Sequence, residues 1–294
     1  VIRYLRWLKE MPIDTDQVFV VDRNFNYLGS LLITSLLTEE PERMVETLIN
    51  NDFSKPVSAD TDETEVALLF EQRNLISAPV IDENNQLVGR ITIDDVVDVI
   101  RDQAEHSVMS MVGLDEDEDV FAPIIQSSKR RSVWLGVNLV TAFIAVYFIG
   151  LFEATLQQKI ALAILMPVVA SMGGIAGTQT LIIVTRGIAT GRVTTANIKT
   201  LINKEVALSG LNGIIWSIVI GLITYYWFAD LLLSLIIALA IITNLVVAAF
   251  SGAFLPLLLT KLKIDPALAG GVILTTITDV IGFVAFLGLA ALFI

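Results

Sequence analysis

The feature that most constrains this chain is a series of long apolar segments in its second half. Each has about the 20 residues that a helix needs to cross the hydrocarbon core of a bilayer. Only 17% of the 294 residues are charged, whereas soluble domains have about a quarter. We therefore predict five transmembrane helices, over Val133–Phe152, Ile160–Ile183, Val206–Phe228, Leu231–Leu259 and Ala267–Phe293.

Basic side chains mark the flanks that we expect to face the cytoplasm. They gather before the first predicted span, between the second and third, and between the fourth and fifth: Lys129, Arg130, Arg131, Arg186, Arg192, Lys199, Lys204, Lys261 and Lys263. The opposite flanks carry Lys159 and little else. The positive-inside rule then predicts a multi-pass plasma-membrane protein with its front part in the cytoplasm and its C-terminus outside.

The front of the chain is acidic. Nearly all the carboxylates lie at or before Asp119, and the formal net charge of the chain is −12. Such a chain has no surface with which to neutralise phosphates, so a nucleic-acid partner is excluded, whereas cations are attracted. The chain has no cysteine, which excludes disulfides, thiolate zinc sites and cysteine nucleophiles.

The first hundred residues contain an internal repeat. The apolar strand Val18–Asp22 and the strand Pro79–Asp82 are each followed by a polar turn, a second apolar run and a helix. At an offset of about 60 residues, Asp22 aligns with Asp82 and Gly29 with Gly89. This pattern predicts two copies of one strand–turn–strand–helix unit.

The repeat resembles a pair of CBS domains, modules that bind adenosyl ligands and regulate attached proteins. The second copy has the family's G-h-h-T-x-x-D pattern as Gly89-Arg-Ile-Thr92-Ile-Asp-Asp95. By this resemblance, Thr92 would meet a phosphate and Asp95 the ribose hydroxyls of ATP. The first copy departs from the pattern, since Ser35 ends it. At most one nucleotide site is therefore expected, and a scaffold without nucleotide remains an alternative.

Acidic residues cluster in two places near the predicted membrane domain. They are Asp94, Asp95 and Asp98 at the start of a helix, and Asp115, Glu116, Asp117, Glu118 and Asp119 just before the first span. Acids at a helix start also complement the helix dipole, which needs no ligand. A hard divalent cation, however, takes oxygen ligands and relieves repulsion between carboxylates. We therefore expect these acids to bind a regulatory Mg²⁺.

One acid lies near the middle of the fifth predicted span. Asp279 follows Thr275-Thr-Ile-Thr, and no lysine or arginine lies at matching depth. A carboxylate at mid-bilayer costs roughly 2.5–3.5 kcal/mol, so it normally faces a partner or a water-filled path. We therefore expect Asp279, with Thr275, to face an ion path. A protonated acid bonded to a neighbouring helix is the alternative.

The second predicted span contains Pro167 and a glycine-rich run. Gly173, Gly174 and Gly177 lie in Ser171-Met-Gly-Gly-Ile-Ala-Gly-Thr-Gln-Thr180. We expect a break in this helix, with backbone carbonyls freed to bind the metal ion, because irregular backbone is tolerated in a membrane where it lines a cavity. The spacing of Gly173 and Gly177 is also that of a G-x-x-x-G packing motif.

These features together resemble the MgtE magnesium channel family along the whole chain. The matching features are the CBS pair, the five spans, the run Met166–Gly191, and Asp265-Pro-Ala267 before the span that contains Asp279. The chain departs from the family's G-G-N-T-G-N-Q run, since Ile175 and Thr178 replace asparagines. The resemblance implies a homodimer with a pore on its two-fold axis, a bacterial inner-membrane location, and a helical domain upstream of Val1.

The expected fold is an α+β tandem CBS domain (residues 1–105), an acidic connecting segment (106–132) and an α-helical domain of five transmembrane helices (133–294). The expected function is passive Mg²⁺ influx, gated by cytoplasmic Mg²⁺ at the acidic segments. A proton- or sodium-coupled divalent-cation exchanger, a non-transporting sensor, and a preference for Co²⁺ or Mn²⁺ remain alternatives. We expect no enzyme, because P-loop, serine and zinc-protease motifs are absent and an aspartyl protease needs two carboxylates at depth.

Overall fold

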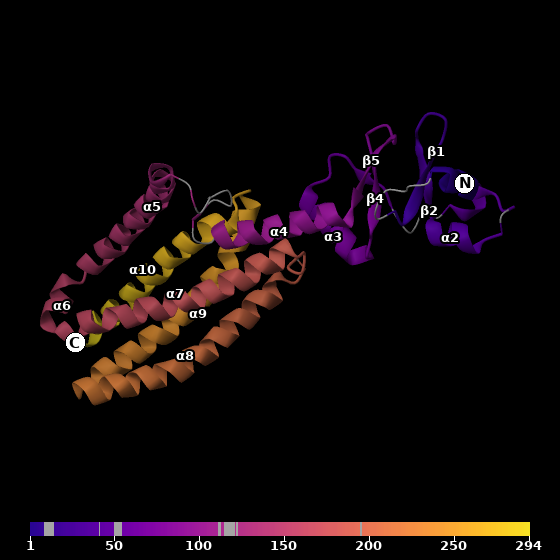
Figure 1. The fold of residues 1–294 in the computed structure, drawn as a ribbon. Helices are drawn as coiled ribbons and strands as arrows, with labels where there is room; N and C mark the ends of the chain where they lie inside the picture. Colours follow the sequence, from indigo (N-terminus) through magenta and orange to yellow (C-terminus); the bar gives the residue numbers. More distant parts are fainter. Residues whose placement is uncertain are drawn as a thin grey trace. The chain divides into compact units, whose positions relative to one another are not determined.

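The computed structural model describes residues 1–8, 15–40, 42–49, 55–110, 113–114, 121, 123–194 and 196–294. Two compact units make up the chain, Val1–Glu105 and His106–Ile294 (Figure 1).

The first unit contains the two predicted copies of the repeat. Its elements are α1 (Ile2–Leu8), β1 (Gln17–Val21), β2 (Tyr27–Leu32), α2 (Ile33–Thr38), the 3₁₀ helix η1 (Val45–Leu48), β3 (Val57–Ser58), α3 (Glu63–Arg73), β4 (Ser77–Ile81), β5 (Leu87–Thr92) and the first turns of α4 (Ile93–Ser110). In the first copy β1 pairs with β2 alone, whereas in the second β4 pairs with β5 on one side and with β3, in parallel, on the other.

The two hairpin turns have the same construction. Asp22 Oδ1 accepts hydrogen bonds from the backbone N–H groups of Asn24 (2.8 Å) and Asn26 (2.9 Å). Asp82 Oδ1 accepts the corresponding bonds from the residues two and four positions later, at 2.9 and 2.8 Å. The aspartates align in the sequence because each fixes its turn by accepting the backbone N–H groups of residues that follow it.

Backbone hydrogen bonds join the two copies through these turns. The N–H of Tyr27 donates to the carbonyl of Asn85 at 2.9 Å, and the N–H of Leu87 donates to that of Phe25 at 2.9 Å. The two acceptor residues, Phe25 and Asn85, have positive φ angles of 64° and 63°. The copies therefore pack as equivalent partners at this edge.

The second copy has the larger core. Side chains from β3, α3, β4 and α4 surround Phe70, which is 1% exposed, and include Val57, Val66 and Ala78. Helix α3 starts at Asp62, whose side chain accepts the N–H of Thr64, and it ends at a left-handed residue, Asn74. An aspartate at the N-cap and a left-handed asparagine after the last turn are typical helix-end signals.

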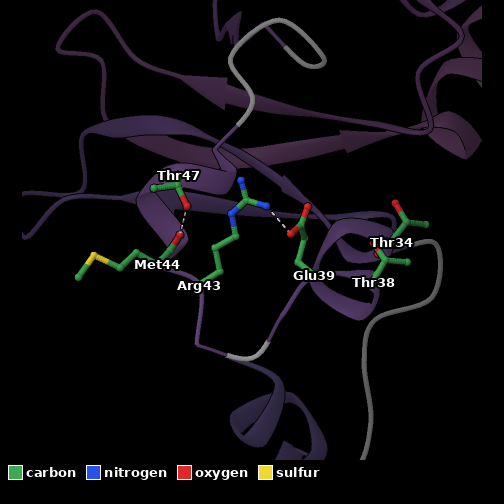
Figure 2. A network of polar contacts seen from close by, with 6 residues as sticks. All are labelled: Thr34, Thr38, Glu39, Arg43, Met44 and Thr47. Atoms are coloured by element: carbon green, nitrogen blue, oxygen red, sulfur yellow. Dashed lines mark hydrogen bonds and ion pairs between the residues drawn. The ribbon is translucent and has the colours of Figure 1, made fainter.

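Local polar contacts hold the segment that follows α2 (Figure 2). Arg43 pairs with Glu39, four residues earlier, and the Thr47 hydroxyl donates to the carbonyl of Met44 at 2.7 Å. The Arg43 and Glu39 side chains are 50% and 35% exposed, so their pair contributes little stability.

The second unit is helical. It contains α5 (Ile124–Gly150), α6 (Glu153–Gln158), α7 (Ile160–Ala189), α8 (Ile198–Phe228), α9 (Leu231–Lys261) and α10 (Pro266–Phe293). Among the described residues, five helices are long and apolar enough to cross a membrane. The prediction of five spans is thus confirmed, and the short α6 between the first two spans was not foreseen.

Helix α9 is the centre of this unit. It packs against α7, α8 and α10, and α5 packs against α10 (Figure 1). The helices approach closely where they carry small residues: a Cβ added at Gly252 of α9 would lie 2.5 Å from the carbonyl oxygen of Gly177 in α7. Small residues are what allow helix backbones to meet in a bilayer, where apolar side chains gain little over lipid.

The prediction of a broken second span is wrong. Helix α7 continues from Ile160 to Ala189 with Pro167 inside it. A proline removes one backbone hydrogen bond and can kink a helix, yet here packing against α9 and α10 supports the turns on both sides. The glycine-rich run is therefore a packing surface on a continuous helix.

Candidate ion-binding site

The central feature of the candidate site is the carboxylate of Asp279. This residue lies at the middle of α10, roughly 20 Å from either end at 1.5 Å per residue. Its side chain is partly exposed. In the part of the chain that the structure describes, Asp279 has no hydrogen-bond or ion-pair partner and is not part of a cluster of three or more metal-binding side chains. One chain thus offers a single carboxylate at this depth.

Thr275 lies one turn before Asp279 on the same face of α10 and is exposed. Its hydroxyl donates to the carbonyl of Gly271 at 2.9 Å, which leaves the lone pairs of the oxygen available to a ligand. Thr275 also lines a cavity of about 470 Å³, together with residues of α4, α5, α7 and α10 and with Gly113. Thr275 therefore borders a cavity, and Asp279 lies one helical turn beyond the residues that line it.

Two further polar side chains line this cavity. They are Thr178 of α7 and Asn138 of α5. Thr178 is one of the two positions at which the family that the sequence resembles has asparagine. Ile175, the other replaced position, is 57% exposed. Sequence reasoning missed Asn138, although an asparagine inside an apolar span is itself a signal of a polar path.

The glycines of α7 differ from one another. Gly173 and Gly177 are buried, and an added Cβ would lie 2.3 Å from Asn244 Nδ2 at Gly173 and 3.1 Å from Leu274 at Gly177. An added Cβ at Gly174 would have nothing within 4 Å. The packing alternative thus describes Gly173 and Gly177, and the carbonyl-ligand role of all three glycines remains a prediction.

A fully buried amide joins three helices near Asp279. Asn244 of α9 is 0% exposed, and its Nδ2 donates to the carbonyl of Val169 in α7 at 2.8 Å. A Cβ added at Gly282, three residues after Asp279, would lie 2.6 Å from the same Nδ2. The amide therefore fixes α7 and α10 against α9 beside the ion site. Sequence reasoning missed this residue too.

The predicted nucleotide residues lie together at the start of α4. Thr92 is 8% exposed, and its backbone N–H and hydroxyl donate to Asp95 Oδ2 at 3.1 and 3.0 Å. These contacts stabilise the first turn of a helix, which is the ligand-free explanation of the acids.

The other regulatory acids are scattered or outside the described residues. Asp98 lies 3.9 Å from Arg101, with both side chains more than 70% exposed. Within the described ranges, Asp94, Asp95 and Asp98 do not form a group that could hold a metal ion. Asp115, Glu116, Asp117, Glu118 and Asp119 lie outside the described residues.

The fold and the site together define a class: a multi-span membrane protein with an attached CBS module and an unpaired carboxylate in one span. The comparisons with known proteins make the class specific. Residues 166–289 match the MgtE family, described as divalent cation transporters, and residues 51–102 match the CBS domain. The membrane part of the chain is thus similar to the MgtE family.

Relatives with similar sequences support this assignment. The chain is 32% identical to a magnesium transporter MgtE of Bacillus subtilis (strain 168) over 99% of its length, and 27% identical to one of Enterococcus faecalis (strain ATCC 700802 / V583) over 94%. It spans 64% and 60% of the lengths of these relatives.

A solved structure of the cystathionine beta-synthase pair domain of a putative Mg²⁺ transporter from Shewanella oneidensis MR-1 matches 35% of this chain and 60% of that chain. The identity is 27% and the TM-score 0.32.

Proposed function

We propose that this chain is the membrane and regulatory part of a magnesium transporter in which Asp279 binds the ion during its passage. The observation that carries the proposal is the carboxylate at the middle of α10, which has no partner among the residues that the structure describes and lies one turn after Thr275, a residue that lines a cavity. The names of the related proteins, magnesium transporters of two bacteria, support the choice of cargo.

The donor set suits hydrated Mg²⁺. This ion prefers oxygen ligands and gives up its waters reluctantly, so it is usually held by one or two carboxylates with several waters retained. Asp279, the Thr275 hydroxyl and, at longer range, carbonyls of the Gly173–Gly177 run would contact those waters. Selectivity would come from the size and charge of the cavity.

One carboxylate for a divalent ion leaves the site half complete. A homodimer that brings two copies of α10 to one axis would supply two Asp279 side chains. Asp279 and Thr275 are both accessible on the face of α10 that such a partner would share. The transport would need no chemical energy, because an inside-negative potential provides about 2.3 kcal/mol per charge per 100 mV.

Substitution of Asp279 tests the proposal. Asp279→Asn keeps the shape of the side chain and removes its charge. Glu153→Gln is the matched control, since Glu153 is an exposed acid of the same unit in α6. We expect the parent and Glu153→Gln to rescue growth in low Mg²⁺ of a host without its own uptake systems and to take up Mg²⁺ in liposomes, and Asp279→Asn to fail in both assays. Full uptake by a folded Asp279→Asn protein would refute the proposal.

The same liposomes distinguish the transport mechanisms. A passive channel conducts Mg²⁺ in the absence of any proton or sodium gradient, and a coupled exchanger does not. A non-transporting sensor would leave Mg²⁺ flux of the parent at the level of empty liposomes. Competition by Co²⁺ and Mn²⁺ in this assay ranks the ions.

Regulation by cytoplasmic Mg²⁺ is the second part of the proposal. Mg²⁺ bound by the acids of α4, or by those of the 115–119 segment, would stabilise a closed form, because a ligand favours the state that binds it better. Replacement of Asp94, Asp95 and Asp98 by asparagine would then reduce inhibition by Mg²⁺ on the cytoplasmic side. Unchanged inhibition in this triple variant, and in one that neutralises the 115–119 segment, would refute the gating scheme.

ATP at the second CBS copy is the remaining element. A bound nucleotide would replace the bond between Thr92 and Asp95 with contacts to phosphate and ribose. Calorimetric titration of ATP into the protein and into Thr92→Val tests this: binding by the parent that Thr92→Val weakens supports the site, and no binding by the parent removes it.

A further inference from the structure

A second cavity of the membrane unit lies where α7 ends and α8 begins, away from the ion site. It has a volume of about 530 Å³. Three cationic side chains line it: Arg186 from the last turn of α7, Arg192 from the connection, and Lys204 from α8. Thr190, Asn197 and Thr200 add polar groups at the same wall.

The charge of this cavity is positive. Arg186 and Arg192 are exposed, and neither forms an ion pair with any residue that the structure describes. Lys204 lies 3.4 Å from Glu205, a side chain that is 3% exposed. One carboxylate therefore faces three cations, and the two guanidinium groups are free to bind an anion. Arginine is well suited to phosphate, since its planar group donates two parallel hydrogen bonds.

The connection that carries Arg192 is ordered by its own hydrogen bonds. Asn197 Nδ2 donates to the carbonyl of Arg192 at 2.7 Å, and Asn197 Oδ1 accepts the N–H of Thr194 at 2.9 Å. The N–H of Val193 donates to the carbonyl of Gly187 at 2.8 Å. A Cβ at Gly187 would lie 2.5 Å from Val193, so glycine is needed for this approach. Arg192 thus projects from a loop that hydrogen bonds hold in place, between the two helices that carry Arg186 and Lys204.

The position of the cavity and its apolar lining indicate an amphipathic ligand. It lies at the junction of two predicted spans, where phospholipid headgroups are found. Ile183, Val193 and Leu201 form its apolar part, and Ile183 is 51% exposed. A free phosphate ion has no apolar group that could contact these side chains, whereas the glycerol and the upper acyl chain of a lipid would contact them.

We propose that this cavity binds the phosphate of an anionic phospholipid, with Arg186, Arg192 and Lys204 around the headgroup and Ile183 and Leu201 against the chain. Basic pockets between membrane helices on the cytoplasmic side are known sites for anionic headgroups. The positive-inside rule alone requires only that basic residues be present on this flank. It does not require that these residues line one cavity, or that the loop with Arg192 is held by hydrogen bonds.

A binding experiment on the purified full chain in neutral detergent tests this proposal. Delipidated protein is titrated with short-chain phosphatidylglycerol, short-chain phosphatidylcholine and inorganic phosphate. The test variants are Arg192→Gln and the double variant Arg186→Gln/Arg192→Gln. The control is Lys261→Gln/Lys263→Gln, which removes the same charge from exposed positions outside the cavity lining. Circular dichroism and size-exclusion chromatography establish that each variant is folded.

We expect saturable binding of phosphatidylglycerol by the parent and the control. The double variant should bind about 30-fold more weakly, from about 1 kcal/mol per cationic side chain at a headgroup, and Arg192→Gln should fall between. Phosphatidylcholine should bind more weakly, because it has no net charge.

Two results would overturn the proposal. An equal loss in the control would mean that only general surface charge matters, and displacement of the lipid by inorganic phosphate at matching concentration would mean that the ligand is a soluble phosphate. Neither result depends on Mg²⁺ transport, so the lipid site and the proposed function can fail separately.

Discussion

The packing of Asn244 against two glycines leads to a quantitative prediction for Gly173→Ala. The added methyl would lie 2.3 Å from Asn244 Nδ2 and 2.7 Å from its Cγ. Asn244 has little room to withdraw, because it is fully buried and a Cβ at Gly282 of α10 would also lie 2.6 Å from its Nδ2. The methyl must therefore push α9 away from α7, and this displacement breaks the bond from Nδ2 to the carbonyl of Val169.

The expected cost follows from three effects. Overpacking of a filled site costs about 1–3 kcal/mol, and an unpaired buried amide about 1–3 kcal/mol more. Alanine in place of glycine in a helix returns about 1 kcal/mol. The free energy of unfolding should therefore fall by about 1–5 kcal/mol. Gly174→Ala is the matched control, since its methyl meets nothing within 4 Å. This variant should be as stable as the parent or up to about 1 kcal/mol more stable.

Unfolding by SDS in mixed micelles, followed by circular dichroism, measures both variants. A double-mutant cycle with Asn244→Ala adds a sharper test, because removal of the amide also removes the clash. The cost of Gly173→Ala should then shrink by more than about 1 kcal/mol in the Asn244→Ala background. A Gly173→Ala protein as stable as Gly174→Ala, or additive effects in the cycle, would refute this account of the site.

Three further predictions concern stability. Gly252→Ala should destabilise the protein, because its methyl would lie 2.5 Å from the carbonyl oxygen of Gly177. Gly210→Ala is the control and should not destabilise it, because its methyl would have nothing within 4 Å. Unfolding in SDS compares the two variants, and equal midpoints would contradict the close contact between α7 and α9. The N–H of Leu233 and the side chain of Lys159 hold the pKa of Asp230 below its ordinary value of 3.8. Its ionised form therefore stabilises the fold above that value, and this contribution is lost as the pH falls through the lowered pKa. Asp230→Asn should lose less stability than the parent between about pH 5 and about pH 3, and parallel losses would count against the pair. Phe25→Asn should raise the free energy of unfolding by about 0.5–1 kcal/mol, because Phe25 has a φ of 64° and asparagine accepts this conformation at the equivalent position Asn85. Thermal unfolding of the parent and the variant measures this effect, with Leu28→Asn as a control at another exposed apolar residue. A lower melting temperature for Phe25→Asn than for the parent would contradict the prediction.

The sequence predicted most of the elements because their signals are local. A helix in lipid satisfies its own backbone hydrogen bonds, so about 20 apolar residues suffice to define a span. The turns after β1 and β4 were predictable because Asp22 and Asp82 accept hydrogen bonds from the backbone of the residues that follow them in the same turn. Asp279 and Thr275 were found because a carboxylate inside a span is rare and costly.

The tertiary structure decided how the helices meet, and here local signals failed. Pro167 and three glycines predicted a break, but α7 continues because α9 and α10 pack against that run. Asn244 was overlooked because its partner lies on another helix, and Asn138 because the cavity that it lines forms only when helices pack together. An apolar side chain in a span has a similar free energy in contact with protein and in contact with lipid. The contacts between helices therefore depend on small residues and on single hydrogen bonds. The composition of the sequence therefore determines which segments span the membrane, whereas the arrangement of these helices around Asp279 depends on a few atoms where each pair of helices crosses.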